Sequence, residues 1–217
     1  KPPAPPPPSA PPAPQAVLDY PGPYESQEVE DTTGWNGLTT NNDWSYVVTI
    51  DFPSPLVIGP HYIKASESNA ISGNVLFFGL YDWYTSGGPP SMVFEWAGHQ
   101  WDSLYTQQIE SAVAASFAGK SVTFAIVYDA ANSNAATAPD LTDLKIYYQV
   151  DTTWQLATMD YTVDAWDAAD DDNGGIAAEF KLGPSKDAGG ILSNFRAYNV
   201  ALSEADLLLM QPPPPPP

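Results

Sequence analysis

Apolar and polar residues alternate with a period of two along several separate segments of the chain. These segments are residues 44–52, 91–96, 121–129, 144–151 and 177–183. In the first of them, the residues that share one face are Trp44, Tyr46, Val48, Ile50 and Phe52. Side chains on one face of a strand repeat every two residues, so each segment predicts a half-buried β-strand.

Two further segments depart from this alternation. Residues 74–84 are almost continuously apolar, which predicts a central strand that is buried on both faces. Residues 107–117 predict a helix, with a loop or a strand that runs into an alanine-rich connection as the alternative. Because the connections are rich in Gly, Pro, Asn and Asp, they favour turns. The whole pattern predicts an all-β fold, a sandwich of two antiparallel sheets.

The end of the chain predicts one more strand and then a short helix. Residues 191–198 alternate like the other strands. Ser203 and Asp206 are three positions apart, which is the spacing of a helix N-terminal capping box. The three leucines at 207–209 are expected to form the apolar side of a helix of one or two turns. Pro212 ends that helix, because proline cannot continue it.

Proline is concentrated at the two ends of the sequence. Nine of the 24 prolines lie in residues 1–14 and six lie in residues 212–217. Such runs favour the extended polyproline II conformation and bury no core. We therefore expect two linkers around one domain at 15–211, in a chain that is an excised piece of a longer protein. The alternative role for the proline runs is to bind proline-recognising domains.

The charge balance excludes several classes of partner. The chain has seven basic and 26 acidic residues, a formal net charge of −19, and no cysteine. Nucleic acids and anionic membrane surfaces attract clustered Lys and Arg, so neither is an expected partner. No apolar run approaches the roughly 20 residues that cross a bilayer, so membrane insertion is not expected. The absence of cysteine excludes disulfides, thiolate metal sites and cysteine nucleophiles.

The segment 191–210 resembles the closing segment of laminin-G-like and pentraxin-like jelly rolls, in the concanavalin A-like lectin/glucanase superfamily. In that family the last strand and helix read I-D-D-V-R-I-Y-N-R-A-L-S-x-x-E-I. The matching residues here are Phe195, Arg196, Tyr198, Asn199, Ala201, Leu202 and Ser203. Ser193 and Asn194 replace the two acids of the motif, so a calcium ligand that relatives take from that position is not expected here. The resemblance implies a jelly-roll sandwich, of a kind that often binds carbohydrate, over roughly residues 40–210.

Catalysis is not expected, because the required carboxylates are missing from the sequence pattern. Retaining glycoside hydrolases of this superfamily carry E-x-D-x-x-E on one strand, since they need two carboxylates about 5 Å apart. The only E-x-D here lies at 204–206, where it predicts a helix cap. Glu95 is the one acid on a strand among aromatic residues, with Asp82 or Asp102 as a conceivable partner. A diverged glycoside hydrolase or polysaccharide lyase remains the catalytic alternative.

Acidic loops make calcium the expected cofactor, because calcium prefers six to eight oxygen ligands. The main candidate ligands, in a glycine-containing turn, are Asp170, Asp171, Asp172 and Asn173. A second cluster contains Asp129 and Asn132, and the N-terminal acids Glu28, Glu30 and Asp31 are a third possibility. The alternative for each cluster is a solvated acidic turn.

Aromatic residues in turns are candidates for carbohydrate binding, because sugar rings stack on flat aromatic faces. The candidate ligand-binding residues are Asp82, Trp83, Tyr84, Trp96, His99 and Trp101. Packing in the core or between strands is the alternative for each tryptophan. Trp35 lies in an N-terminal loop, where packing explains a tryptophan less easily, and both roles are open for Trp154 and Trp166.

These observations predict a non-catalytic carbohydrate-binding or adhesion module held on polyproline spacers in a larger surface protein. Its expected partners are a glycan or cell-surface polysaccharide and other domains of the same chain. Its expected location is extracellular, at a cell or virion surface. The alternative of a different class is a structural or protein-interaction domain of a fibre or capsid.

Overall fold

The computed structural model describes residues 12–31, 35, 42–66, 74–81, 90–97, 104–130, 144–164 and 179–210. Most of the predicted N-terminal linker and all of the C-terminal one lie outside these residues. The predicted domain boundaries therefore stay a prediction.

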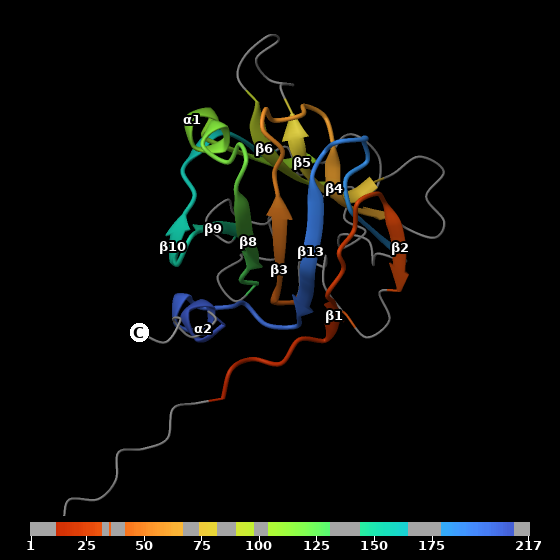
Figure 1. Cartoon of the computed structure of the whole chain (residues 1–217). Coiled ribbons are helices and arrows are strands. Elements are labelled where there is room, and N and C mark those ends of the chain that lie inside the picture. Colours follow the sequence, from red (N-terminus) through yellow and green to blue (C-terminus); the bar gives the residue numbers. More distant parts are fainter. Residues whose placement is uncertain are drawn as a thin grey trace, which may run out of the picture.

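Within the described residues the chain forms two antiparallel sheets that face each other across one core (Figure 1). In sheet order, the six-stranded sheet contains β1 (Leu18–Tyr20), β13 (Ile191–Tyr198), β3 (Trp44–Asp51), β8 (Ser121–Tyr128), β9 (Leu144–Val150) and β10 (Thr153–Leu156). The seven-stranded sheet contains β11 (Met159–Asp164), β7 (Leu104–Ile109), β6 (Ser91–Ala97), β5 (Asn74–Tyr81), β4 (His61–Ser66), β12 (Glu179–Leu182) and β2 (Glu28–Asp31). The predicted all-β jelly-roll sandwich is confirmed.

The period-two pattern assigns the inner face of the strands correctly. The alternating aromatic and aliphatic residues of β3, β8 and β9 all belong to the main core. β5 is the middle strand of its sheet, and both of its faces are buried. Leu76 and Phe78 face the core, whereas Phe77 and Tyr81 form a separate buried cluster with Val93. The prediction of a central strand buried on both faces is confirmed.

The core is dominated by aromatic rings that meet across the two sheets. Trp44 is fully buried, and its ring centroid lies 5.3 Å from that of Trp96 and 5.6 Å from that of Tyr128. Phe124 makes edge contacts with Phe78 of the opposite sheet at 5.1 Å. Aromatic pairs at such distances add stability beyond the area that they bury.

A short helix follows β7 at one end of the sandwich. This helix, α1 (Ser111–Ala115), places Ala114 in the main core. The predicted helix over 107–117 is therefore right only in its middle, because residues 107–109 belong to β7. In the described part of the chain, neither helix has the length and apolar character needed to cross a membrane.

The C-terminal helix, α2 (Glu204–Leu209), starts at the predicted capping box. The Ser203 hydroxyl accepts a hydrogen bond from the Asp206 backbone N–H at 3.2 Å, and the Asp206 carboxylate accepts one from the Ser203 backbone N–H at 2.8 Å. The predicted common apolar side of the three leucines is wrong. Leu207 is fully buried, but Leu208 is 60% exposed and Leu209 is 47% exposed, since consecutive helix residues cannot share one face.

α2 covers one half of the outer face of the six-stranded sheet. A second apolar cluster under it contains Val47, Ala125, Val127, Tyr147, Tyr198, Leu202 and Leu207. The indole N–H of Trp154 donates to the carbonyl of Leu207 at 3.1 Å, which fixes the helix against β10. In Figure 1 the helix lies at the lower end of the sheet, so within the described residues it leaves the upper half of that face uncovered.

Candidate functional site

The predicted carbohydrate-binding residues fall into two groups. Asp82, Trp83, Tyr84, His99 and Trp101 lie outside the described residues, so their role stays a prediction. Trp96 is described, and for this residue the prediction is wrong. Its side chain has no exposed surface, and its ring packs against Trp44 and Tyr128. Trp96 follows Met92 and Phe94 on the inner face of β6, so it faces the core and offers no surface to a ligand.

The pairing of β6 with β5 and β7 fixes where the two predicted aromatic loops join the described strands. Tyr81 at the end of β5 pairs with Ser91, whereas Ala97 at the other end of β6 pairs with Leu104. Residues 82–89 and 98–103 therefore leave the described chain at opposite ends of β6. At about 3.3 Å per residue, these ends are about 20 Å apart.

Two of the remaining tryptophans have structural roles. Trp35 is buried against Phe180 at 5.0 Å, and its indole N–H donates to the carbonyl of Tyr198 at 3.1 Å. Trp154 is half-buried beneath α2. Packing is the role that the structure shows for both residues, against the loop-borne ligand contact considered for Trp35 and as one of the two roles left open for Trp154. Trp166 lies outside the described residues.

The calcium prediction stays open. Asp170, Asp171, Asp172, Asn173 and Asn132 lie outside the described residues. Asp129 directly follows β8 and is half-buried. Among the described side chains, no three His, Asp or Glu residues come together as a metal site. Glu30, of the N-terminal group, accepts a hydrogen bond from the Tyr24 hydroxyl at 2.6 Å, and burial together with this bond raises the pKa of Tyr24.

The described acids do not show the carboxylate pair that glycoside hydrolysis would need. Glu95 lies on the outer face of β6 and is only 5% exposed. Its conceivable partners, Asp82 and Asp102, lie outside the described residues. Glu204 and Asp206 lie at the start of α2, where they act on the helix terminus as predicted.

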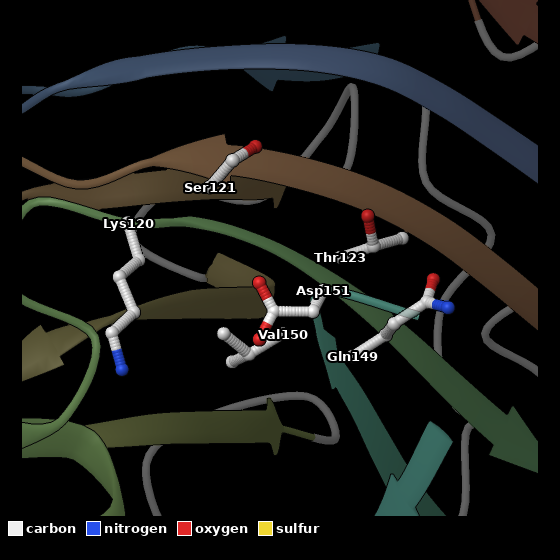
Figure 2. Close-up of a pocket in the computed structure, with 6 residues that line it drawn as sticks. All are labelled: Lys120, Ser121, Thr123, Gln149, Val150 and Asp151. Atoms are coloured by element: carbon white, nitrogen blue, oxygen red, sulfur yellow. The ribbon is translucent and has the colours of Figure 1, made fainter. Parts of the chain in front are cut away.

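A polar groove lies on the uncovered half of the outer face of the six-stranded sheet. It has a volume of about 350 Å³ and is lined by Lys120, Ser121, Thr123, Gln149, Val150 and Asp151. Figure 2 shows these side chains along β8, along β9 and at the turn that follows β9. All but Val150 carry a hydrogen-bonding or charged group, so the groove offers donors and acceptors within one small area.

The groove is built on firmly paired strands. Thr123 lies directly opposite Gln149 in the β8–β9 pair, and its hydroxyl is 3.0 Å from that of Thr49 on β3. Val150 pairs with Thr153, so Asp151 is the first residue of a two-residue hairpin turn. Asp151 has a φ of 69°, a conformation that Asp tolerates better than most residues. The turn thereby holds the carboxylate at the edge of the groove.

Sequence reasoning did not single out these groove residues. Gln149 and Asp151 are recognisable as the polar side of an alternating strand, which ordinarily means solvent exposure. The useful signal is the cross-strand pairing of Thr123 with Gln149. That pairing depends on register, which the alternation alone does not define.

A second feature of the outer surface is a small aromatic cluster on the seven-stranded sheet. The His61 ring stacks on Phe77 at 5.2 Å and meets the edge of Tyr81 at 5.1 Å. Gly79 lies opposite His61 and leaves room for the Tyr81 ring, since a Cβ there would lie 2.8 Å from that ring. Burial, and then the positive charges of Lys64 and Lys186, lower the pKa of His61 to about 4.

Comparisons with known proteins show the fold. No protein-family model matches the sequence, and no curated protein matches it. Several solved structures are similar. The Ruminococcus gnavus IT-sialidase CBM40 bound to α2,3-sialyllactose has a TM-score of 0.53 and 20% identity, over 90% of this chain and 98% of that one. The same CBM40 bound to α2,6-sialyllactose has a TM-score of 0.54 and 16% identity, over 90% of this chain and 98% of that one.

The botulinum neurotoxin serotype D ligand-binding domain in complex with N-acetylneuraminic acid is also similar. It has a TM-score of 0.52 and 10% identity, over 89% of this chain and 50% of that one. These likenesses support the predicted jelly-roll sandwich fold. Membership of the laminin-G-like or pentraxin-like group stays a prediction, because identities this low establish shared architecture alone.

Proposed function

We propose that the chain is a non-catalytic carbohydrate-binding module whose groove on β8 and β9 binds the hydroxyl groups of a glycan. The observation that carries this proposal is the set of polar side chains that line the groove. Sugars present several hydroxyls at close spacing, and each can donate and accept a hydrogen bond. Hydroxyl, amide, carboxylate and ammonium groups within one groove match that chemistry.

The position of the groove favours binding by a preformed surface. Four of its residues lie on two adjacent strands that pair from Val122 and Val150 to Tyr128 and Leu144, and the other two, Lys120 and Asp151, directly adjoin those strands. Little chain ordering is therefore required when a ligand binds, and the loss of conformational entropy is small. A shallow groove also suits a glycan chain that runs across the sheet, because such a chain keeps one side in water.

Two further observations support the proposal. The similar solved structures include a sialidase CBM40 bound to sialyllactose and a toxin domain in complex with N-acetylneuraminic acid. The sequence also has Trp83 and Trp101 in loop segments, where they would add stacking contacts. A module of this kind acts outside the cell or on a surface, where polysaccharides are accessible. Calcium is proposed as a structural ion of its acidic loops, not as part of the groove.

The test is a glycan array followed by calorimetric titration with the best neutral and acidic hits. Gln149→Ala and Asp151→Asn should each weaken binding about tenfold, the loss expected for one hydrogen bond to a sugar hydroxyl. Lys145→Ala is the matched control, because Lys145 is exposed on β9 at the end that α2 covers. It should leave affinity unchanged.

Other outcomes would point elsewhere. If Trp83→Ala and Trp101→Ala abolish binding while the groove variants do not, the loops and not the groove bind the glycan. Turnover of a polysaccharide that Glu95→Gln abolishes would establish an enzyme and contradict the proposal. A stable protein complex without any glycan binding would favour the structural or protein-interaction alternative.

A further inference from the structure

One row of side chains crosses five of the six strands of the six-stranded sheet. The pairing of the strands places each member of this row directly opposite the next, so all of them share the outer face. From β13 to β10 the members are Ser193, Thr49, Thr123, Gln149 and Trp154. All five side chains are half-buried. Neighbouring strands are about 4.8 Å apart, so this cross-strand row is about 19 Å long.

The groove occupies only the middle of the cross-strand row. Thr123 and Gln149 line the groove (Figure 2). The row continues on one side to Thr49 and Ser193 and on the other side to Trp154. A single sugar ring is too short to contact both Ser193 and Trp154, whereas a chain of several sugar units can do so.

The four polar members of the row offer uncharged hydrogen-bonding groups. The hydroxyls of Thr49 and Thr123 lie 3.0 Å apart. One of them donates to the other, so the O–H of the second is left to donate to a ligand. The Ser193 hydroxyl accepts from the Asn194 side chain at 3.4 Å, which leaves its own O–H to donate. The Gln149 amide both donates and accepts.

Trp154 ends the row with a ring whose orientation is fixed. Its indole N–H donates to the carbonyl of Leu207 at 3.1 Å, which ties the ring to α2. In addition to this packing, the half-buried ring lies opposite Gln149 at the end of the polar row. An aromatic face that is already held in place can stack on a sugar ring with little loss of side-chain entropy.

The charges beside the row favour an uncharged ligand. Asp51 lies on the same face of β3, and Asp151 lies at the edge of the groove beside Lys120. Arg196, farther along β13, forms an ion pair with Asp19 at 3.2 Å. Two carboxylates and one ammonium group therefore border the row, in a chain with a net charge of −19. A carboxylate on the ligand would meet net repulsion here.

We infer that the cross-strand row binds an uncharged linear glycan that lies across the strands, with several of its sugar units in contact at once. This inference rests on the proposed binding of glycans at the groove, and it adds the length and charge class of the ligand. A glycan in this direction meets a new side chain about every 4.8 Å, at each successive strand. Because each hydrogen bond contributes only modestly, affinity is expected to accumulate along the chain.

The experiment measures how affinity depends on the length of the glycan. Cello-, xylo- and manno-oligosaccharides of two to six units are titrated into the 217-residue chain, with sialyllactose as the acidic counterpart, by calorimetry and by NMR. In the series that binds, affinity should rise at least tenfold from two to five units and should change little with salt, because no ligand charge is screened. The longer members should shift the amide signals of Thr49 and Ser193 and the indole signal of Trp154.

Variants outside the groove give the second part of the test. Thr49→Val and Ser193→Ala each remove one hydroxyl, so each should weaken binding of the five-unit glycan about threefold to tenfold. Neither should change binding of the disaccharide, which a merely structural role of these residues would also affect. Lys145→Ala, at the end of β9 that α2 covers, is the control and should change neither.

The two proposals fail in different ways. The inference is overturned if affinity does not depend on length, if the two variants weaken short and long glycans equally, or if sialyllactose binds more tightly than every neutral glycan. In these cases the groove proposal stands as long as a glycan shifts the signals of β8 and β9. If no glycan shifts those signals, the proposed function itself is wrong, and the inference fails with it.

Discussion

Replacing His61 by phenylalanine should make folding stability less sensitive to acid. The pKa of His61 is lowered from an ordinary 6.5 to about 4, by burial and then by the nearby Lys64 and Lys186. Because the folded-state pKa is the lower one, protonation favours the unfolded chain. The stabilising contribution of neutral His61 is fully present above pH 6.5 and is lost as the pH falls toward 4.

The magnitude follows from the size of this shift. A difference of about 2.5 pKa units corresponds to at most about 3.4 kcal/mol. His61 is only half-buried, so solvent screens part of the interaction and a loss of about 1 to 2 kcal/mol is the realistic expectation. His61→Phe retains a ring that can stack on Phe77 and meet the edge of Tyr81, but this ring cannot titrate. The variant therefore isolates the part of the folding stability that depends on proton binding.

The assay is urea unfolding of the two proteins, followed by tryptophan fluorescence at several pH values between 4 and 7.5. Carboxylates titrate in both proteins over part of this range, so their contribution cancels in the difference between the two free energies of unfolding. That difference should move by about 1 to 2 kcal/mol in favour of the variant as the pH falls from 6.5 to 4. A flat difference would falsify the reasoning, as would an NMR titration that gives His61 a pKa near 6.5.

Three further predictions concern stability. Ser203→Ala should lower the free energy of unfolding by about 1 kcal/mol through loss of the α2 cap. Ser203→Thr keeps a capping hydroxyl, so it should retain most of that stability in the same urea unfolding assay. Leu207→Ala should destabilise by about 2 to 5 kcal/mol, because it leaves a cavity under α2, whereas exposed Leu208→Ala should stay within about 0.5 kcal/mol; equal effects would refute the assignment of the buried face. Removal of calcium by EDTA should lower the melting temperature if the acidic loops hold a structural ion, and an unchanged melting temperature would argue against that site.

The inner face of the sandwich was predictable from the sequence, because the side chains that point into the core recur at every second residue of each strand. Trp44 and Phe124 lie on that face as their alternation indicated. The outer face was harder to predict. Tyr147 and Tyr198 are buried there in the cluster that α2 covers, and the contact between Tyr147 and α2 joins residues far apart in the sequence. The period of two shows which residues share a face but not what covers it.

The site was less predictable than the fold, and Trp96 shows why. Its position near a predicted turn suggested a ligand contact, but Trp96 faces the core together with Met92 and Phe94. The alternation over residues 91–96 places these three residues on one face, so the face of the strand, and not nearness to a turn, decides the role of this tryptophan. The groove on β8 and β9 depends on the register of these two strands. The sequence alone does not define register, so the groove could not be assembled from it.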